Sequence, residues 1–276
     1  MWADLHVHTT ASDGTDTPRE VVVRAASVGL SAIAIADHDT LEGIVPAVEA
    51  GKEIGLEVVP AIELGTELEG REIHVLGYLM DLYNEDFLSR LAFFRRTREE
   101  RGLKIVNILK HMGLNISYEQ VLEISGGGSV GRPHIARALV QSGVVGSLEE
   151  AFHIYIGNGK CAYVPRFKYS PIEAVRLIRR AGGVAVLAHP GLGQGYDQFI
   201  LPLVKEGLQG LEVYHPGHDP EMSRYYLEFC KRHGLLATGG SDYHGLSHKE
   251  HNSLGKVKVS YEVVETLRQL ASQGVG

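Results

Sequence analysis

Short apolar runs in this chain end repeatedly in histidine and carboxylate residues. The stretches at 31–36 and 183–188, each a run of small and branched apolar residues, are typical of buried parallel strands. Side chains at the exit ends of parallel strands point into one shared mouth. The polar groups at such ends lie at 4–8, 37–39, Glu63, 73–75, 188–190, 214–216 and 241–244. The pattern predicts a ring of imidazoles and carboxylates around one mouth, which is typical of a metal site with several ions.

The segments between these groups alternate between strand-like and helix-like patterns. Thr17 with Glu20 and Ser170 with Glu173 have the spacing of helix capping boxes, each with a proline at the first helical position. Such alternation with short connections predicts a parallel sheet or barrel. The strands near 57–65 and 72–79 are expected to form a direct pair. Strands are expected near 2–8, 31–37, 57–65, 72–79, 183–189, 208–214 and 235–241, with helices near 17–29, 40–55, 170–181 and 219–234.

About ninety residues with helical periodicity interrupt the alternation between the fourth and fifth strands. We interpret residues 82–168 as a helical insertion packed over the mouth of a barrel formed by residues 1–81 and 169–276. Candidate helices of the insertion lie at 85–112, 117–124, 132–142 and 147–156.

Charge is distributed unevenly between these parts. Residues 82–170 contain 12 Lys/Arg against 8 Asp/Glu, whereas the rest of the chain contains 15 against 26. An acidic barrel suits divalent cations, and a basic insertion suits an anionic substrate held against them. The arginine-rich run at 95–101, taken alone, is more typical of a solvated helix face.

The composition of the chain bears on its expected location in the cell. No apolar run approaches the roughly 20 residues that span a bilayer, and the first strand begins too early to leave room for a signal peptide. Cys161 and Cys230 form neither a metal-binding spacing nor a disulfide framework. We therefore expect a cytoplasmic protein.

Nine residues are candidate metal ligands. His6 and His8 are two apart on a strand, so their imidazoles face the same side. Imidazole with carboxylate and no thiolate suits Zn²⁺, Mn²⁺ or Fe²⁺. This number of ligands requires at least two ions, and three are compatible with it. The candidates are His6, His8, Asp13, His38, Glu63, His74, His189, Asp242 and His244.

Two chemistries are open to such a centre. Metal-bound water ionises near neutral pH, and paired metals clamp an in-line displacement at phosphorus. A metal-bridging hydroxide that attacks phosphorus is therefore our first hypothesis. The alternative is attack on a carbonyl, as in amide hydrolysis.

The order and spacing of these motifs resemble the PHP (polymerase and histidinol phosphatase) superfamily over nearly the whole chain. The resemblance implies a distorted (β/α)₇ barrel with a trinuclear metal centre. One ion would bind His6, His8, Glu63 and Asp242; a second would share Glu63 and add His74 and His189; the third would bind Asp13, His38 and His244.

One of these positions departs from part of the superfamily. Its histidinol phosphatases usually have histidine at the position of Asp13. The difference argues against histidinol phosphate as the substrate.

The segments 128–139 and 162–168 resemble a narrower group, the stand-alone phosphoesterases with a helical cap. That group includes nucleoside 3′,5′-bisphosphate phosphatases and 5′→3′ exoribonucleases that act on short RNA. The resemblance implies a small phosphorylated nucleotide or a 5′-phosphorylated short RNA as substrate. It implies neither a membrane nor a DNA duplex as partner, and it leaves the oligomeric state open.

Several residues are candidates for substrate binding. Ser129, Arg132 and His134 precede or open a helix whose N-terminal N–H groups suit a phosphate. An ordinary glycine-rich turn with a surface arginine is the alternative. Arg166 and Lys168, on the return to the barrel, are secondary candidates.

Catalytic roles are expected for Glu63 and Asp242, as ligands within the centre, and for His215. His215 follows a strand, and an imidazole at that place suits protonation of a leaving oxygen or a hydrogen bond to phosphate. It could equally be a structural residue near the ligands. Asp37 and Asp39 are expected to orient ligands, although Asp39 could instead cap a helix.

Three rival functions remain at this point. A histidinol-phosphate phosphatase is disfavoured by Asp13, and an amidohydrolase-type carbonyl hydrolase would not need a basic insertion. A nucleic-acid-binding module without activity would use its metals structurally. The insertion is too weakly basic for a strong grip on long RNA.

Overall fold

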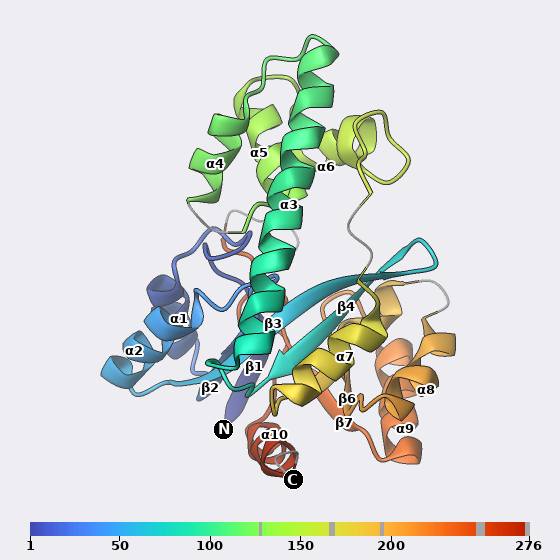
Figure 1. The fold of residues 1–276 in the computed structure, drawn as a ribbon. Helices are drawn as coiled ribbons and strands as arrows, with labels where there is room; N and C mark the ends of the chain where they lie inside the picture. The colour runs from blue at the N-terminus through green and yellow to red at the C-terminus, as the bar shows by residue number, and fades with distance from the viewer. Residues whose placement is uncertain (127–128, 166–168, 194–195, 247–251, 274–276) are drawn as a thin grey trace.

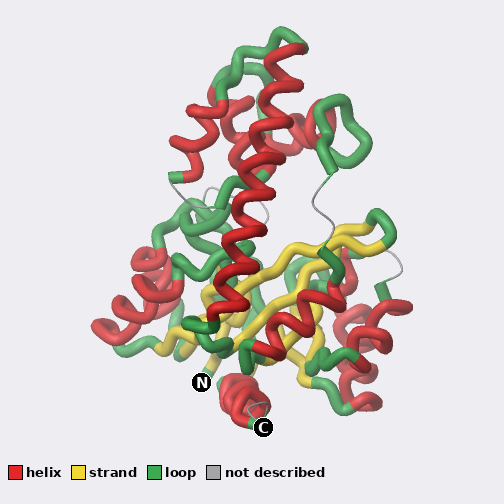
Figure 2. The backbone as a smooth tube through the Cα atoms, viewed as in Figure 1, coloured by secondary structure: helices red, strands yellow, loops and turns green. Residues whose placement is uncertain are grey.

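A mixed β-sheet curled into a nearly closed barrel forms the centre of the protein (Figures 1 and 2). The computed structural model describes residues 1–126, 129–165, 169–193, 196–246 and 252–273. The strands are β1 (Trp2–Val7), β2 (Ala32–Ile35), β3 (Glu57–Leu68), β4 (Arg71–Tyr78), β5 (Val184–Leu187), β6 (Gly210–Tyr214), β7 (Leu236–Gly239) and β8 (Val259–Ser260), in the sheet order β7-β6-β5-β4-β3-β2-β1-β8.

The ring closes between β1 and the residues that follow β7. A parallel bridge joins Val7 to Tyr243, and the His8 N–H donates to the Tyr243 carbonyl at 2.8 Å. The predicted distorted α/β barrel is therefore confirmed. Two details differ from the expectation of a parallel barrel. β4 runs antiparallel to β5 as well as to its hairpin partner β3, and the short β8 adds an antiparallel strand to the outer edge of β1.

Helices surround the barrel. The capping boxes predicted at Thr17 and Ser170 are present, with side chains that accept from the Glu20 and Glu173 N–H groups. Within the described part of the chain, no helix is long and apolar enough to cross a membrane. The surrounding helices are α1 (Pro18–Ser27), α2 (Ile44–Ile54), α7 (Pro171–Arg180), α8 (Asp197–Lys205), α9 (Pro220–His233) and α10 (Glu262–Ser272); α8 and α10 were not predicted.

Small and large apolar residues alternate along the strands, so that they lie on opposite faces of the barrel wall. In β2 the small Ala32 and Ala34 belong to one core cluster, whereas Ile33 and Ile35 belong to another that packs on α1 and α2. This alternation is that of a small barrel whose interior is filled by side chains. α10 lies at the end of the barrel opposite the cap, where Val264 and Leu267 join the inner cluster (Figure 1).

The chain between β4 and β5 forms a helical cap above the barrel (Figure 1). Phe87 and Phe94, in the first half of its longest helix, pack into a barrel cluster, whereas Ile105 and Val106, in the second half, pack into the cluster of the cap. The predicted helix at 147–156 is only partly α-helical, because its second half is a π-helical turn. The cap consists of α3 (Glu85–His111), α4 (Tyr118–Ser125), α5 (Arg132–Gln141), α6 (Leu148–Ala151) and η1 (Phe152–Ile156).

Candidate metal centre and adjoining cavity

Four side chains meet at the mouth of the barrel, from β1 and the residue after it, from β3 and from the segment after β7. The His6 and His8 Nε2 atoms are 3.1 Å apart, and both face Glu63 Oε2 at 3.3 Å. Asp242 Oδ1 lies 3.5 Å from His6 Nε2 and 3.2 Å from His8 Nε2. Ligands about 2.0–2.1 Å from a tetrahedral ion are separated by roughly 3.4 Å. The spacing of these four residues therefore fits one shared cation.

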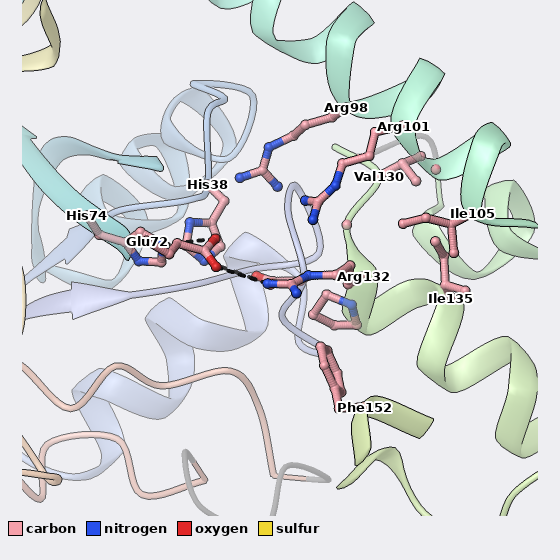
Figure 3. A pocket seen from close by; sticks show the side chains of 14 residues that line it. His38, Glu72, His74, Arg98, Arg101, Ile105, Val130, Arg132, Ile135 and Phe152 are labelled. Carbon is pink, nitrogen blue, oxygen red and sulfur yellow. Dashed lines mark hydrogen bonds and ion pairs between the residues drawn. The ribbon is translucent and has the colours of Figure 1, made fainter. Parts of the chain in front are cut away.

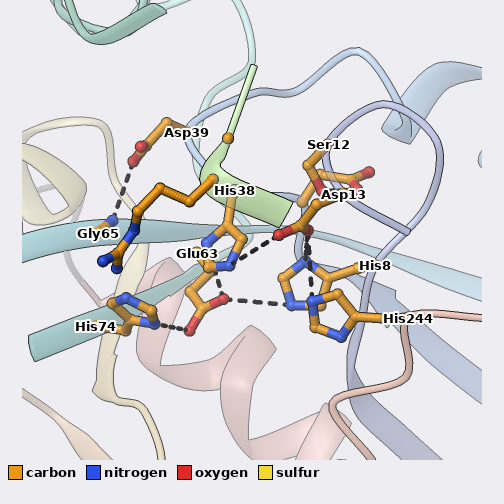
Figure 4. A network of polar contacts seen from close by, with 12 residues as sticks. His8, Ser12, Asp13, His38, Asp39, Glu63, Gly65, His74 and His244 are labelled. Carbon is orange, nitrogen blue, oxygen red and sulfur yellow. Dashed lines mark hydrogen bonds and ion pairs between the residues drawn. The ribbon is translucent and has the colours of Figure 1, made fainter. Parts of the chain in front are cut away.

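Glu63 also connects this group to a second one. Its Oε1 atom lies 2.7 Å from His74 Nδ1 and 3.1 Å from His189 Nε2. The other carboxylate oxygen, Oε2, lies 3.1 Å from His38 Nδ1. One carboxylate thus faces imidazoles on both sides, as a ligand that bridges two ions does (Figure 4).

The loop after β1 carries Asp13 into a third group. Asp13 Oδ1 lies 3.4 Å from His244 Nε2, and Oδ2 lies 3.9 Å from His38 Nε2 (Figure 4). Asp37 sets the shape of this loop, since it accepts hydrogen bonds from the Thr9 N–H at 2.7 Å and the Ser12 hydroxyl at 2.6 Å. The loop folds back toward the strand from which it departs.

Several polar atoms of this cluster are buried without a hydrogen-bond partner among the residues that the structure describes. They include His8 Nδ1, which lies 3.9 Å from Asp13 Oδ1. A buried polar atom without a partner is costly in a folded protein. A bound cation at these groups would satisfy such atoms, and the donor set of imidazole and carboxylate suits a divalent transition metal. The residues present therefore fit the metal ions that the sequence predicts.

Two of the candidate ligands have a backbone conformation unusual for residues other than glycine. His189 has φ of 28° and Asp242 has φ of 50°. Such conformations cost free energy and occur most often at functional sites. Both residues follow the last residues of short strands, where the turn directs their side chains into the mouth.

The charges of the cluster favour ionised carboxylates. Burial acts to raise the pKa of Glu63, but the neighbouring imidazoles of His38, His74 and His6 hold that pKa well below its ordinary value. The pKa of Asp242 is likewise well below the ordinary range, because His6 and His244 outweigh the effect of burial. Both side chains are therefore negative at neutral pH, as metal ligands must be.

Glu212, on β6, is a buried residue that the sequence reasoning missed. Its Oε1 atom accepts from His6 Nδ1 at 2.9 Å, and its Oε2 atom accepts from the His189 N–H at 2.8 Å. Because Nδ1 of His6 donates to a carboxylate, the lone pair on Nε2 points into the cluster. A single glutamate within an otherwise apolar strand was the available signal.

A cavity of about 210 Å³ extends from the cluster into the cap (Figure 3). Its polar wall includes Arg98 and Arg101 from α3 and Arg132 from α5. The interpretation of the run 95–101 as a solvated helix face is therefore wrong for Arg98 and Arg101. An apolar wall lies at the far side, formed by Ile105, Val130, Ile135 and Phe152.

Acidic and backbone groups hold these arginines in place. Arg98 pairs with Asp39, whose other oxygen accepts from the Gly65 N–H at 3.0 Å (Figure 4). Asp39 thus binds an arginine of the cavity wall. The Arg101 Nε–H donates to the Val164 carbonyl at 2.8 Å.

Arg132 connects the cap to the metal cluster. Its guanidinium pairs with Glu72 at 2.9 Å, and Glu72 Oε1 lies 3.5 Å from His74 Nε2 (Figure 3). The Asn158 side chain accepts from a second nitrogen of Arg132 at 3.1 Å.

The other predicted substrate residues lie around the same turn or outside the described chain. His134 is buried, and its Nδ1 accepts from the Gly131 N–H at 3.0 Å. The Ser129 hydroxyl is buried and has no hydrogen-bond partner in the part of the chain that the structure describes. Arg166 and Lys168 lie outside the described residues.

His215 lies beside the cluster rather than within it. The Gly217 N–H donates to its Nδ1 at 3.0 Å, so the hydrogen of the neutral ring is on Nε2. Nε2 lies 3.4 Å from Asp242 Oδ2. The ring is thus placed to donate a hydrogen bond to a carboxylate of the centre.

A barrel of this kind with histidines and carboxylates at its mouth defines a metal-dependent hydrolase. Comparison with known families identifies the class further: the PHP domain model matches residues 4–161, and the chain belongs to that family.

Known relatives of similar length support this assignment. A 5′-3′ exoribonuclease of Haemophilus influenzae is 35% identical over 87% of this chain and 89% of its own length. A 3′,5′-nucleoside bisphosphate phosphatase of Chromobacterium violaceum is 32% identical over 87% of this chain and 86% of its own length. The crystal structure of a metal-dependent phosphoesterase from Bifidobacterium adolescentis superimposes with a TM-score of 0.91 at 36% identity, covering 97% of this chain and 96% of that one. The protein is thus a metal-dependent phosphoesterase.

Proposed function

We propose that the protein hydrolyses the 3′ phosphoester of a nucleotide that carries a 5′ phosphate. The substrate is a nucleoside 3′,5′-bisphosphate or the 5′-phosphorylated end of a short RNA. The observation that carries the proposal is the cavity in which Arg98, Arg101 and Arg132 adjoin the metal cluster. The relatives named above are a 5′-3′ exoribonuclease and a 3′,5′-nucleoside bisphosphate phosphatase, which supports both substrate classes.

We assign the candidate ligands to three divalent cations, of Mn²⁺, Zn²⁺ or Fe²⁺ type. Divalent ions at such a site supply a hydroxide nucleophile near neutral pH and neutralise charge on the phosphoryl oxygens. The first site contains His6, His8, Glu63 and Asp242, the second Glu63, His74 and His189, and the third Asp13, His38 and His244.

The arginines of the cavity bind the 5′ phosphate. A guanidinium forms paired, charge-assisted hydrogen bonds with phosphate oxygens, and the partners of Arg98 and Arg132 pre-orient their forks. Ile105, Ile135 and Phe152 provide an apolar surface for the base. The 5′ phosphate and the base are specific to a nucleotide, and histidinol phosphate has neither of them.

His215 and the turn before α5 have supporting roles. The Nε2–H of His215 stabilises Asp242 and can donate to the departing 3′ oxygen. Ser129 remains a candidate donor to phosphate, since its buried hydroxyl has no hydrogen-bond partner among the described residues. Within this proposal the insertion at 82–168 is the substrate-binding unit and the barrel is the metal-binding unit of a cytoplasmic enzyme.

The test is phosphate release by the Mn²⁺-loaded protein from adenosine 3′,5′-bisphosphate, adenosine 3′-monophosphate and histidinol phosphate. We expect the bisphosphate to have the highest kcat/KM. Arg98→Ala should raise KM for the bisphosphate by roughly tenfold, the loss expected for one charge-assisted contact. Arg96→Ala is the matched control, because Arg96 is on the same helix and mostly exposed to solvent.

Three outcomes would contradict the proposal. A preference for histidinol phosphate would show that the cavity does not select nucleotides. Equal KM values for Arg98→Ala and Arg96→Ala would remove the arginine from phosphate binding. Activity in a folded Asp242→Ala variant would remove the cluster from catalysis.

A further inference from the structure

A second cavity, which Pro133 also lines, adjoins the metal cluster. It has a volume of about 280 Å³ and shares four lining residues, Asp13, His38, His74 and Pro133, with the first cavity. The part that belongs to it alone brings together Arg137, Leu148 and Leu192 with the ligands Glu63, His189, Asp242 and His244. The centre can therefore be reached from two directions.

The two cavities differ in charge and in the helices that form them. Three arginines line the first cavity, from α3 and the start of α5. Arg137, one α-helical turn or more beyond Arg132, is the one Arg or Lys among the described residues that line the second. Its guanidinium donates to the Asp13 carbonyl at 2.5 Å. Leu192, another lining residue, is 53% exposed, so it lies at the solvent side of the second cavity.

The number of substituents on phosphorus distinguishes the possible substrates. The 3′ phosphate of a nucleoside bisphosphate carries a single organic group, the nucleoside, which one cavity accommodates. A phosphodiester carries two organic groups, one on each ester oxygen. When its phosphorus lies at the cluster, the second group needs a separate space on another side of the centre.

We propose that the second cavity binds the nucleotide that follows the scissile phosphate, so that a phosphodiester spans both cavities. The proposal rests on the function proposed above and names its second binding site. The 5′-terminal nucleotide lies among Arg98, Arg101 and Arg132, and the next nucleoside lies along Leu148 and Leu192. Arg137 attracts the phosphates of the chain.

The chemistry is the same for both substrates. A water oxygen forms a bond to phosphorus, the bond between phosphorus and the 3′ oxygen breaks, and that oxygen receives a proton. A bisphosphate yields a nucleoside 5′-monophosphate and inorganic phosphate. A 5′-phosphorylated dinucleotide yields two nucleoside 5′-monophosphates, with the scissile phosphate retained by the second nucleoside, in the second cavity.

The test compares two substrates that differ only beyond the scissile phosphate: adenosine 3′,5′-bisphosphate and the 5′-phosphorylated dinucleotide of adenosine. The measured quantity, in the Mn²⁺-loaded protein, is the ratio of kcat/KM for an oligonucleotide, either this dinucleotide or the corresponding trinucleotide, to kcat/KM for the bisphosphate. The dinucleotide places a nucleoside in the second cavity, and a trinucleotide adds a further phosphate near its outer part.

Charge substitutions at Leu192 should move this ratio in opposite directions. For the trinucleotide, Leu192→Asp should lower the ratio by about fivefold and Leu192→Lys should raise it by a similar factor, since one added charge nearby changes the interaction by about 1 kcal/mol. Both effects should shrink at high salt. Leu201→Asp is the control, because Leu201 is an exposed leucine of α8 outside both linings.

Each outcome decides the matter. A ratio that changes in the Leu192 variants but not in Leu201→Asp supports the second cavity as the binding site. Ratios equal to that of the wild type in both Leu192 variants overturn it. Cleavage of the bisphosphate without cleavage of either oligonucleotide also overturns it and leaves the proposed function intact, whereas a protein that cleaves none of the three substrates contradicts the proposed function itself.

Discussion

At the scale of single residues, the candidate metal centre depends on neighbours that are not among its candidate ligands. Gly240 is the clearest case, since a Cβ atom there would lie 2.4 Å from both the Cβ and the N atom of His6. Only glycine allows the end of β7 to approach β1 so closely. Glu212 is a second such neighbour, because its carboxylate accepts hydrogen bonds that orient the His6 ring and the backbone of His189.

Replacement of Glu212 by glutamine tests this support. The neutral amide is a weaker acceptor for the His6 ring, so we expect metal affinity to fall about 10–100-fold with the fold retained. The measurement is a competition between the protein and a chelator for Zn²⁺. Glu123→Gln, at an exposed position of α4, provides the control. Equal affinities in the two variants would show that Glu212 has no influence on the ligands.

Protonation of His134 should oppose folding. Burial lowers the pKa of this imidazole from 6.5 to about 4 in the folded protein. Between these values the unfolded chain binds a proton that the folded chain excludes, so the free energy of unfolding falls as the pH drops through this window. His134→Gln keeps an acceptor for the Gly131 N–H and has no charge to gain.

The measurement is urea unfolding of the metal-free protein at about pH 7.5 and about pH 4, where the wild type should lose about 2–3 kcal/mol more than the variant. Identical losses in the two proteins would mean that His134 titrates as it does in water.

At the scale of elements, α3 belongs to two hydrophobic cores. Its 27 residues extend over about 40 Å, and its ends pack into the barrel and the cap respectively. Two of the arginines that line the first cavity, Arg98 and Arg101, lie between these two packed segments of α3. The position of Arg98 and Arg101 is therefore determined by packing at both ends of one helix.

Truncation in either half of α3 should destabilise the whole molecule. Phe94→Ala and Val106→Ala each remove a buried side chain, and we expect losses of about 3–4 and about 1–3 kcal/mol. Because the helix is continuous, both variants should unfold in one cooperative transition. Leu103→Ala, at a largely exposed position of the same helix, should cost much less. The check is denaturant unfolding followed by two probes, and separate transitions for cap and barrel would contradict the expectation.

The elements also show which parts of the molecule a sequence can predict. The strand ends that carry histidine could be predicted from the sequence, because each buried run is short and apolar. The structure brings all nine candidate ligands to one mouth. The direction of β4 relative to β5 was not visible, because a long insertion separates the two strands. Arg98 and Arg101 were misjudged because helical periodicity cannot show which face adjoins a cavity. The role of Glu212 could not be predicted, because it depends on contacts with His6 and His189, which are distant in the sequence.

At the scale of the whole molecule, the described chain brings together barrel strands that start far apart in sequence, and the candidate metal ligands lie on or directly after six of them. Ions held at that point would cross-link β1, β3, β4 and the segments after β5 and β7. The same cluster contains buried polar atoms that have no hydrogen-bond partner within the described chain. Metal binding should therefore stabilise the fold as well as supply the chemistry.

Addition of Mn²⁺ to the chelator-treated protein tests this. At about one hundred times the dissociation constant, one ion adds about 2.7 kcal/mol to the free energy of unfolding, which for a chain of this size raises Tm by about 5–10 °C. The measurement is thermal unfolding with and without the ion. A chelator should reverse the gain, and Asp242→Ala should reduce it. An unchanged Tm with Mn²⁺, Zn²⁺ and Fe²⁺ would contradict the assignment of the cluster.

The dual use of α3 has a consequence for how such proteins diversify and can be redesigned. If two flexible linkers attached a cap to its barrel, the whole cap could be exchanged between related proteins as one unit. Here, deletion of the cap at the start of α3 would also strip Phe87, Leu91 and Phe94 from the outer layer of the barrel. A graft that preserves the barrel must join the two proteins inside the helix, between Phe94 and Gly102, and keep its helical phase. New substrate ranges are thus more accessible through side-chain changes on the existing cap than through its replacement.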